Sequence, residues 1–223
     1  TFSISASIVP KPNVWLQGMG WSTILTGQAG LANTAVIQDS TTYTSASPIL
    51  NFWLTDLKID GTNMSRTGYS SGRKGVNIHY MQSGKFTGLY IYNTPATCLG
   101  VDFLYDTWID HNTVDTCGTS GQHDGVVGSN GIGIGVCGLT GTNLNEDVII
   151  TNNVAKNGNN KGIMLEAQAG CSSPRHAIIA NNESYLNYDG ISVSGAVRVS
   201  VLNTKSWSNT RYGFYFEEDA RVR

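Results

Sequence analysis

The sequence predicts an all-β solenoid, a fold in which short strands repeat along one axis. A tetrad of Gly, apolar, variable and apolar residues recurs at intervals of 23 to 33 residues. A second recurring segment lies between the tetrads and ends in Asn, while helical periodicity is weak throughout. Two strands and one Asn in each unit of 20–33 residues are typical of a solenoid. The tetrads begin at Gly75, Gly100, Gly133, Gly162, Gly190 and Gly213.

Each tetrad is expected to be a strand whose second and fourth residues face the core, because alternate side chains of a strand point to opposite faces. These positions hold only Val, Ile, Leu or Phe. If the glycines align, two outward columns follow. The first holds Asn77, Asp102, Gly135, Met164, Ser192 and Tyr215, and the second holds His79, Leu104, Cys137, Glu166, Ser194 and Glu217.

The other segments support the same fold. Residues 1–60 alternate as short strands between glycine-rich turns. Asn tolerates the left-handed backbone that tight turns need, and stacked Asn side chains can hydrogen-bond from coil to coil. We therefore expect a ladder of the Asn residues that end the second segment. These are Asn93, Asn112, Asn153, Asn182 and Asn203.

Length, composition and charge limit the classes of protein to which this chain can belong. The 223 residues suffice for one domain, here residues 1–223, and neither end resembles a natural boundary, which suggests a fragment of a longer chain. Only 13% of residues are charged and the net charge is -2, so no basic field indicates binding to nucleic acid or to an anionic membrane. No apolar run reaches the ~18 residues of a spanning helix.

Three consecutive coils contain insertions, at residues 118–130, 138–146 and 167–174. Long loops on adjacent coils of a solenoid form walls around its binding face. The longest loop carries His123 and Asp124, which could act as base or acid over a groove, or could be an ordinary polar loop tip. These insertions mark the expected position of a functional site.

The four cysteines lack the spacing of a metal site. Cys98 and Cys117 each lie five residues after an Asn of the repeat, so neighbouring coils should bring them together, and Cys137 and Cys171 both follow tetrads. The prediction is two disulfides, Cys98–Cys117 and Cys137–Cys171, with four free thiols as the alternative. Disulfides would indicate an oxidising, extracellular setting.

Variable coils above 20 residues, with Val/Ile stacks and Asn turns, resemble the right-handed parallel β-helix of the pectate-lyase-like superfamily. The opening segments at residues 1–4, 14–20 and 23–25 are similar to the entry coils of phage tailspikes and related polysaccharide-degrading enzymes. The resemblance implies a right-handed parallel β-helix with coils of about 20–33 residues. A β-sandwich is the competing fold, but it does not require a Gly tetrad in every unit.

In this superfamily, catalytic groups lie on the outward strand face, so the resemblance makes Asp102, Glu166 and Glu217 catalytic candidates. Glu166 and Glu217 would stand two coils apart, roughly 9.6 Å at Cα, and carboxyls ~6.5–9.5 Å apart suit inverting hydrolysis. The alternative is that outward carboxylates of a solenoid are simply solvated.

Substrate contacts are expected from Asn77, His79 and Tyr215 on the same face, and Arg175 could bind an acidic sugar. Residues 108–111 resemble a signature of the pectate lyases, but the arginines that flank Pro174 and Arg175 in those enzymes are missing, which argues against that activity. Trp108 and Trp207 are expected to pack in the core. The prediction includes no cofactor or metal, although calcium could bind through Asp102, Asp106 or Asp124.

These features together predict a polysaccharide-processing enzyme that is secreted or on a virion surface, with glycosidase favoured over lyase or epimerase because Arg and Lys are scarce near the groove. Its partner would be the polysaccharide, and the tailspike resemblance allows a homotrimer. The rival is a non-catalytic glycan-binding adhesin or a tail-fibre or tailspike shaft. Three clustered loops favour the enzyme.

Overall fold

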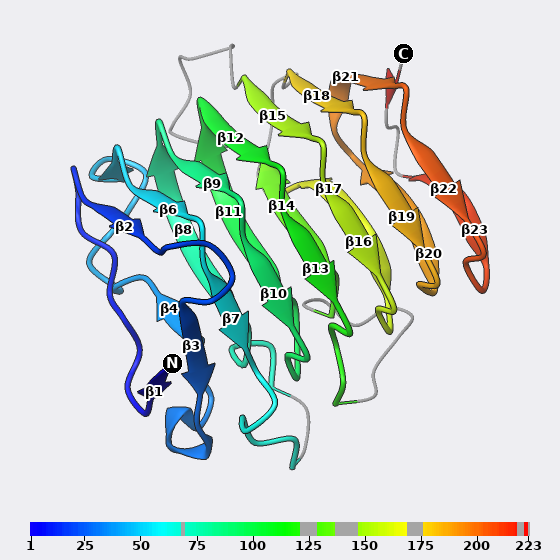
Figure 1. Cartoon of the computed structure of the whole chain (residues 1–223). Helices are drawn as coiled ribbons and strands as arrows, with labels where there is room; N and C mark the ends of the chain where they lie inside the picture. The colour runs from blue at the N-terminus through cyan, green and yellow to red at the C-terminus, as the bar shows by residue number, and fades with distance from the viewer. Residues whose placement is uncertain (68–69, 121–128, 137–146, 169–175, 218–220, 223) are drawn as a thin grey trace.

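The computed structural model describes residues 1–67, 70–120, 129–136, 147–168, 176–217 and 221–222. Within these ranges the chain forms strands and one short 3-10 helix, η1 (Ala29–Leu31). None of the described helical structure is long and apolar enough to cross a membrane. The strands assemble into three parallel sheets that run the length of the molecule (Figure 1).

We name the sheets A, B and C. Sheet A contains β1 (Phe2–Ile4), β3 (Ile24–Gly27), β7 (Lys58–Asp60), β10 (Tyr90–Tyr92), β13 (Thr113–Asp115), β16 (Val154–Lys156), β19 (Glu183–Tyr185) and β22 (Lys205–Trp207). Sheet B contains β4 (Ile37–Gln38), β8 (Val76–Gln82), β11 (Leu99–Tyr105), β14 (Ile132–Val136), β17 (Lys161–Ala167), β20 (Asp189–Ser194) and β23 (Tyr212–Glu217), with β5 (Ile49–Leu50) beside β8. Sheet C contains β2 (Trp15–Gln17), β6 (Trp53–Thr55), β9 (Lys85–Thr87), β12 (Thr107–Asp110), β15 (Val148–Thr151), β18 (Ala177–Ala180), β21 (Val197–Leu202) and β24 (Arg221–Val222).

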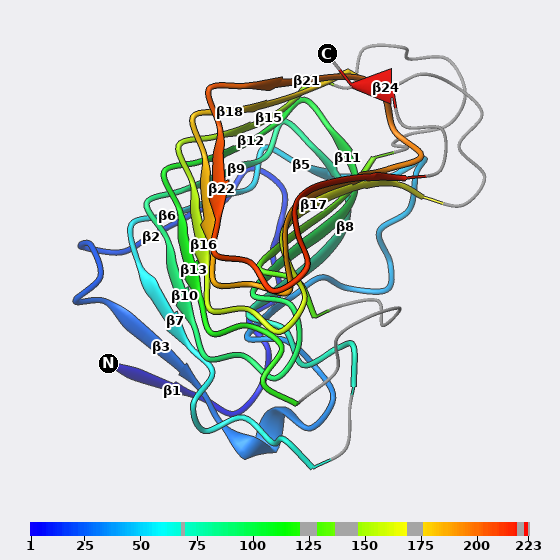
Figure 2. The ribbon, with the colours of Figure 1, turned by 90° about the vertical axis from the view of Figure 1, so that its right-hand side faces the viewer.

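The chain visits the sheets in a fixed order. From β8 onward each coil passes through sheet B, then sheet C, then sheet A, and every strand pairs in parallel with its counterpart in the next coil. Viewed along the axis, successive coils superimpose (Figure 2). The structure confirms the right-handed parallel β-helix and rules out the sandwich, which needs antiparallel sheets.

Columns of apolar side chains fill the interior. In sheet B one inward column places Ile78, Val101, Ile134, Leu165 and Val193 in register, all of them buried. These are the fourth or second residues of the tetrads, and for them the predicted inward position is confirmed. The prediction is wrong for Phe103, which is half-buried while Leu104 takes the core position, and for Phe214 and Phe216, which are exposed. Because a fully buried aliphatic side chain contributes about 1.5–3 kcal/mol, such columns supply most of the stability of a coil.

An asparagine ladder stabilises the turn between sheets C and A. Asn112 Nδ2 donates to Asn153 Oδ1 at 3.0 Å, and Asn153 Nδ2 donates to Asn182 Oδ1 at 3.0 Å. All three residues are buried. Asn93 and Asn203 do not belong to this ladder, contrary to the prediction, because Asn93 binds Arg66 and Asn203 is exposed.

The disulfide between Cys98 and Cys117 is confirmed, with a Cα–Cα distance of 5.5 Å and both residues buried. The two cysteines do not meet in the way predicted, however. Tyr92 pairs with Asp115, so Asn93 is level with Thr116 and not with Asn112. Cys117 follows a strand of sheet A, whereas Cys98 precedes a strand of sheet B, and the turn between these sheets brings them together. Cys137 and Cys171 lie outside the described residues, so their pairing stays a prediction.

Replacing both cysteines, as Cys98→Ala with Cys117→Ala, should lower the free energy of unfolding by about 3 kcal/mol, the value expected for a closed loop of this length. The reason is that the cross-link, with 19 residues of sequence separation, restricts the unfolded chain. Urea denaturation followed by circular dichroism measures the change. An unchanged midpoint and slope would show that the cross-link does not contribute to stability.

Candidate active site on the outer face of sheet B

The register of sheet B differs from the predicted alignment of glycines. Gly100 pairs with Asn77 and Gly133 pairs with Met164, so the tetrads slip by two residues at these two steps. A slip of two keeps each side chain on its face but moves it to another column. The observed outward column is His79, Asp102, Gly135, Glu166, Ser194 and Glu217.

A bulge explains why Leu104 leaves this face. Tyr80 and Phe103, the residues that follow His79 and Asp102, both have a left-handed backbone with φ of 56° and 57°. The register of β11 shifts at this point, and Leu104 turns into the core, where it is fully buried. The predicted outward position of Leu104 is therefore wrong, while His79 and Asp102 end as neighbours.

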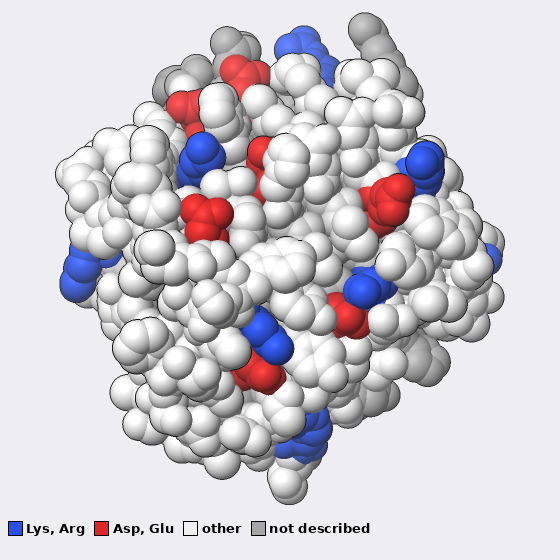
Figure 3. Space-filling model, viewed as in Figure 1, with Lys and Arg blue, Asp and Glu red and all other residues white. Residues whose placement is uncertain are grey.

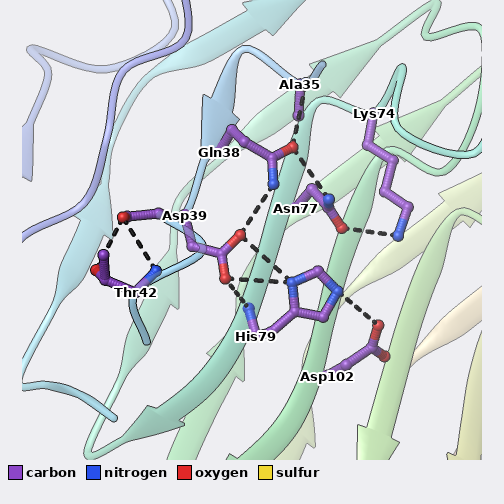
Figure 4. Close-up of polar contacts among 9 residues, drawn as sticks. Ala35, Gln38, Asp39, Thr42, Lys74, Asn77, His79 and Asp102 are labelled. Carbon is purple, nitrogen blue, oxygen red and sulfur yellow. Dashed lines mark hydrogen bonds and ion pairs between the residues drawn. The ribbon is translucent and has the colours of Figure 1, made fainter. Parts of the chain in front are cut away.

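Asp39 holds His79 in place. The two carboxylate oxygens of Asp39 lie 3.3 and 3.2 Å from His79 Nδ1, and Oδ2 also accepts from the His79 backbone N–H at 3.0 Å (Figure 4). Gln38 Nε2 donates to Asp39 Oδ1 at 2.9 Å. The hydrogen bond to Asp39 raises the pKa of His79 above its ordinary value. The other ring nitrogen, Nε2, faces Asp102 Oδ2 at 3.7 Å.

Asp102 lies between His79 and Gly135 in the column. Burial raises the pKa of its carboxyl, and the charges of Lys74 and His79 oppose that rise without cancelling it. The Gly135 backbone N–H also donates a hydrogen bond to the carboxylate. Asp102 is thus a carboxylic acid whose proton is held more tightly than in water, which suits a group that donates a proton.

Lys74 reaches the site from the turn that precedes β8. Its stem passes over Gly100, where an added Cβ would lie 3.0 Å from Lys74 Cδ, and Nζ donates to Asn77 Oδ1 at 2.9 Å. Burial lowers the pKa of Lys74, and the charges of Asp102, Glu166 and Asp39 partly restore it. Lys74 could not be predicted from the repeat, because it lies before the strand and outside the tetrad.

Gln168 joins the second acid to the first. Its Nε2 donates to Asp102 Oδ1 at 3.2 Å and to Glu166 Oε1 at 3.1 Å. Gly135 stands between the two acids in the column, and an added Cβ there would overlap both Gln168 and Asp102. Burial is the largest cause that raises the pKa of Glu166, and the charge of Asp102 adds to it.

The predicted relation between Glu166 and Glu217 is also present. Ser194 pairs with both, so the two glutamates stand two coils apart in one column. Lys161 Nζ lies 3.5 Å from Glu217 Oε1. Tyr215 stacks on Tyr212 with 5.2 Å between ring centroids, and Glu217 raises the pKa of Tyr215 through a hydrogen bond. Glu217 and Tyr215 therefore form a second group next to the acids.

Several predicted residues lie outside the described part of the chain, namely His123, Asp124 and Arg175. Of the residues expected in the core, Trp108 is 49% exposed and Trp207 is 42% exposed, so the prediction for both tryptophans is wrong. Asn77, in contrast, lies on the outer face of sheet B as predicted and is buried there, donating through Nδ2 to Gln38 Oε1 at 3.0 Å.

The described residues contain no group of three or more His, Cys, Asp or Glu side chains that could hold a metal ion. Asp102 contacts His79 and Gln168, whereas Asp106 accepts from Ser83 Oγ at 2.9 Å, so these two acids are held apart by different partners. Among the described residues, Asp102 and Asp106 thus do not belong to such a group. A site that uses Asp124 stays a prediction.

The chain is similar to known proteins in its fold and not in its sequence. No family model matches the sequence, and no curated protein matches it. Among solved structures, the chain is similar to the A-module of the Azotobacter vinelandii mannuronan C-5 epimerase AlgE4, with 16% identity and a TM-score of 0.49, over 93% of this chain and 66% of that one. The AlgE6 A-module gives 14% identity and a TM-score of 0.45, over 93% and 65%. The chain thus spans slightly less than two thirds of either structure.

Proposed function

We propose that this protein is a polysaccharide-processing enzyme whose proton-transferring groups are Asp102 and Glu166. The observation that carries the proposal is that one amide nitrogen, Gln168 Nε2, contacts a carboxylate oxygen of each acid. Two acids with raised pKa values on an outward sheet face form a pair that can exchange protons with a bound substrate.

Hydrolysis of a glycosidic bond is the reaction that this pair supports best. Gln168 Nε2 lies 3.2 Å from the Asp102 oxygen and 3.1 Å from the Glu166 oxygen, so these two carboxylate oxygens are closer to each other than the ~6.5 Å at which the inverting range begins. Glycosidases place their acids ~5–5.5 Å apart when they retain configuration and ~6.5–9.5 Å apart when they invert it. Asp102 would protonate the leaving oxygen, and Glu166 would act as the second carboxylate.

His79 would reload Asp102 with a proton, because Nε2 faces that acid while Asp39 fixes the opposite side of the ring. Glu217, His123 and Asp124 remain proposed as further catalytic groups. Asn77, Arg175 and Tyr215 remain proposed as groups that contact the sugar. The buried disulfide supports a protein that acts in an oxidising setting outside the cell. Assembly as a homotrimer is part of the same proposal.

A lyase or epimerase is the second candidate, and the position of Lys74 favours it. Such enzymes act on uronic acids and must neutralise the sugar carboxylate while a base removes a proton. The Lys74 ammonium beside Asn77, with His79 on the same face, provides positive charge for this task. In this alternative, one of the two acids would accept or return the proton.

A panel of soluble polysaccharides distinguishes these functions. New reducing ends without ultraviolet absorbance from unsaturated uronate indicate a hydrolase, and both signals together indicate a lyase. A change in the proton magnetic resonance spectrum of the recovered polymer, without new ends, indicates an epimerase. Absence of all three signals across neutral and acidic polysaccharides would contradict an enzyme and favour an adhesin or a shaft.

Replacing Lys74 with Met should move the basic limb of the pH–rate profile to higher pH. The Lys74 charge lowers the pKa of both Asp102 and Glu166, so its removal lets both pKa values rise. Lys74→Arg keeps the charge and should leave the limb near its wild-type position. A profile of Lys74→Met that is lower in rate but unchanged in shape would show that Lys74 has only a structural role.

A further inference from the structure

Sheet C carries a row of exposed aromatic side chains on a different sheet from the candidate active site. Trp15, Trp53, Lys85 and Trp108 pair in register on β2, β6, β9 and β12. The three tryptophans are 55%, 41% and 49% exposed. Exposed aromatic residues that are contiguous on a protein surface indicate a binding site, whereas single exposed ones are common and need no explanation.

The four side chains form one continuous strip. Trp15 and Trp53 meet edge to face with 5.8 Å between ring centroids. Lys85 Nζ lies 5.7 Å from the ring centroid of Trp53 and 5.9 Å from that of Trp108, so it sits between the two rings. We call these residues the tryptophan strip. The described residues give Lys85 no carboxylate partner within ion-pair distance.

Two shallow cavities open along the strip. One, of about 350 Å³, is lined by Trp53, Ser83, Gly84, Lys85, Asp106 and Trp108. The next, of about 330 Å³, is lined by Trp108, Asp110, Ile149, Thr151 and Asn152. Ring faces therefore alternate with a hydroxyl, an ammonium and carboxylates. This mixture of apolar faces and hydrogen-bonding edges matches a sugar ring, which has apolar faces and hydroxyls around its rim.

We propose that the tryptophan strip is a second glycan-binding site, which takes a neutral linear polysaccharide laid across the coils. Trp53 and Trp108 stand two coils apart, ~9.6 Å along the axis, so successive rings can stack on sugars two residues apart in an extended chain. Lys85 Nζ would donate to sugar hydroxyls, and Asp106 would accept from them.

Local charge selects a neutral glycan. Lys85 contributes one positive charge, while Asp106 and Asp110 line the same two cavities with two negative charges. Burial opposes the shift, but hydrogen bonds from Thr151, His111 and Asn152 lower the pKa of Asp110 and favour its ionised form. A polyanion would therefore meet net repulsion. The face that carries sheets A and C shows basic and acidic side chains side by side (Figure 3), and ion pairs such as Lys58 with Asp60 and Lys156 with Asp115 leave it little net charge.

Affinity electrophoresis in native gels that contain hydroxyethyl cellulose, glucomannan, xylan or laminarin tests the proposal, with alginate and polygalacturonate as polyanions. At least one neutral polymer should retard the wild-type protein. The double variant Trp53→Ala with Trp108→Ala should bind about tenfold more weakly or worse, since a lost aromatic stacking contact costs on the order of 1 kcal/mol. Trp207→Ala is the matched control, because Trp207 is equally exposed but lies on sheet A.

Circular dichroism spectra of all variants should match that of the wild-type protein, which would show that they are folded. Asp102→Asn should bind like the wild-type protein, so failure of the proposed catalysis would leave this result unchanged. Three outcomes would overturn the proposal: no retardation of the wild-type protein by any neutral polymer, equal retardation of the double variant, or retardation by the polyanions alone. Sedimentation velocity adds a fourth, since self-association that the double variant loses would make a second copy of the chain the occupant.

Discussion

Asp102→Asn should lower the catalytic rate on the polysaccharide that proves to be the substrate by about 10²–10⁴-fold, the usual contribution of a general acid or base. The amide has the shape of the carboxyl but cannot transfer a proton. The wild-type rate should fall as the pH rises through the raised pKa of Asp102, because the acid form is then lost. The residual rate of the variant should not show this fall as the pH rises.

Initial rates across a pH series, with the polymer that gives the strongest signal in the panel, measure this effect. Asp56→Asn is the control, because Asp56 follows β6 in sheet C and contacts Gln17 at 3.3 Å, away from sheet B. It should keep the wild-type rate. If Asp102→Asn retained full activity with an unchanged pH profile, the proton donor would have to be another group, and Glu217 and Asp124 would be tested next.

The pH dependence of stability gives a second measure of the raised pKa of Asp102. A carboxyl whose pKa is raised by folding contributes stability that is present below its unfolded pKa and is lost as the pH rises through the folded pKa. Asp102 should therefore favour folding at acid pH and oppose it at neutral pH. Asp102→Asn should remove this contribution, so the variant should lose less stability than the wild-type protein as the pH rises.

The face of the candidate site could be predicted from the sequence, but its neighbours could not. Side-chain alternation fixes which residues point outward, and this correctly placed Asp102, Glu166 and Glu217 on one face. The column in which each residue stands depends on the lengths of the turns between strands, which a tetrad of glycines does not report. Gly100 therefore pairs with Asn77 and not with Gly75.

Three residues of the site, Asp39, Lys74 and Gln168, were not predicted, for different reasons. Asp39 follows the two-residue strand β4, in a coil that has no tetrad. Lys74 lies before β8 and reaches the site only because Gly100 leaves room for its stem. Gln168 could have been found, since it follows Glu166 by two residues and the alternation of a strand would keep it on the same face.

The error over Trp108 has a physical cause as well. Residues 107–110 read Thr, Trp, Ile and Asp, and hydrophobicity alone would bury both Trp108 and Ile109. Adjacent residues of a strand cannot both face the core, and the structure buries Thr107 and Ile109. The register confirms this choice, because Ile109 pairs with the buried Phe86 and Ile150.

Asn153→Ala should destabilise the protein by at least about 3 kcal/mol, the largest effect on stability that we expect from one side chain. Asn153 Oδ1 accepts from the backbone and side-chain nitrogens of Asn112, and Nδ2 donates to the Ile109 carbonyl and to Asn182 Oδ1. Alanine leaves several of these buried groups without a partner, and each such group costs about 1–3 kcal/mol.

Urea denaturation monitored by circular dichroism measures the change, with Asn203→Gly as the control. Asn203 is exposed and has φ of 42°, so glycine removes its amide but keeps its backbone conformation, and the cost should stay within about 1 kcal/mol. Equal destabilisation by both variants would mean that the buried amide of Asn153 contributes no more to stability than the exposed amide of Asn203. A large effect confined to Asn153 would show that the ladder of amides holds adjacent coils in register, and with them the column that joins His79, Asp102 and Glu166.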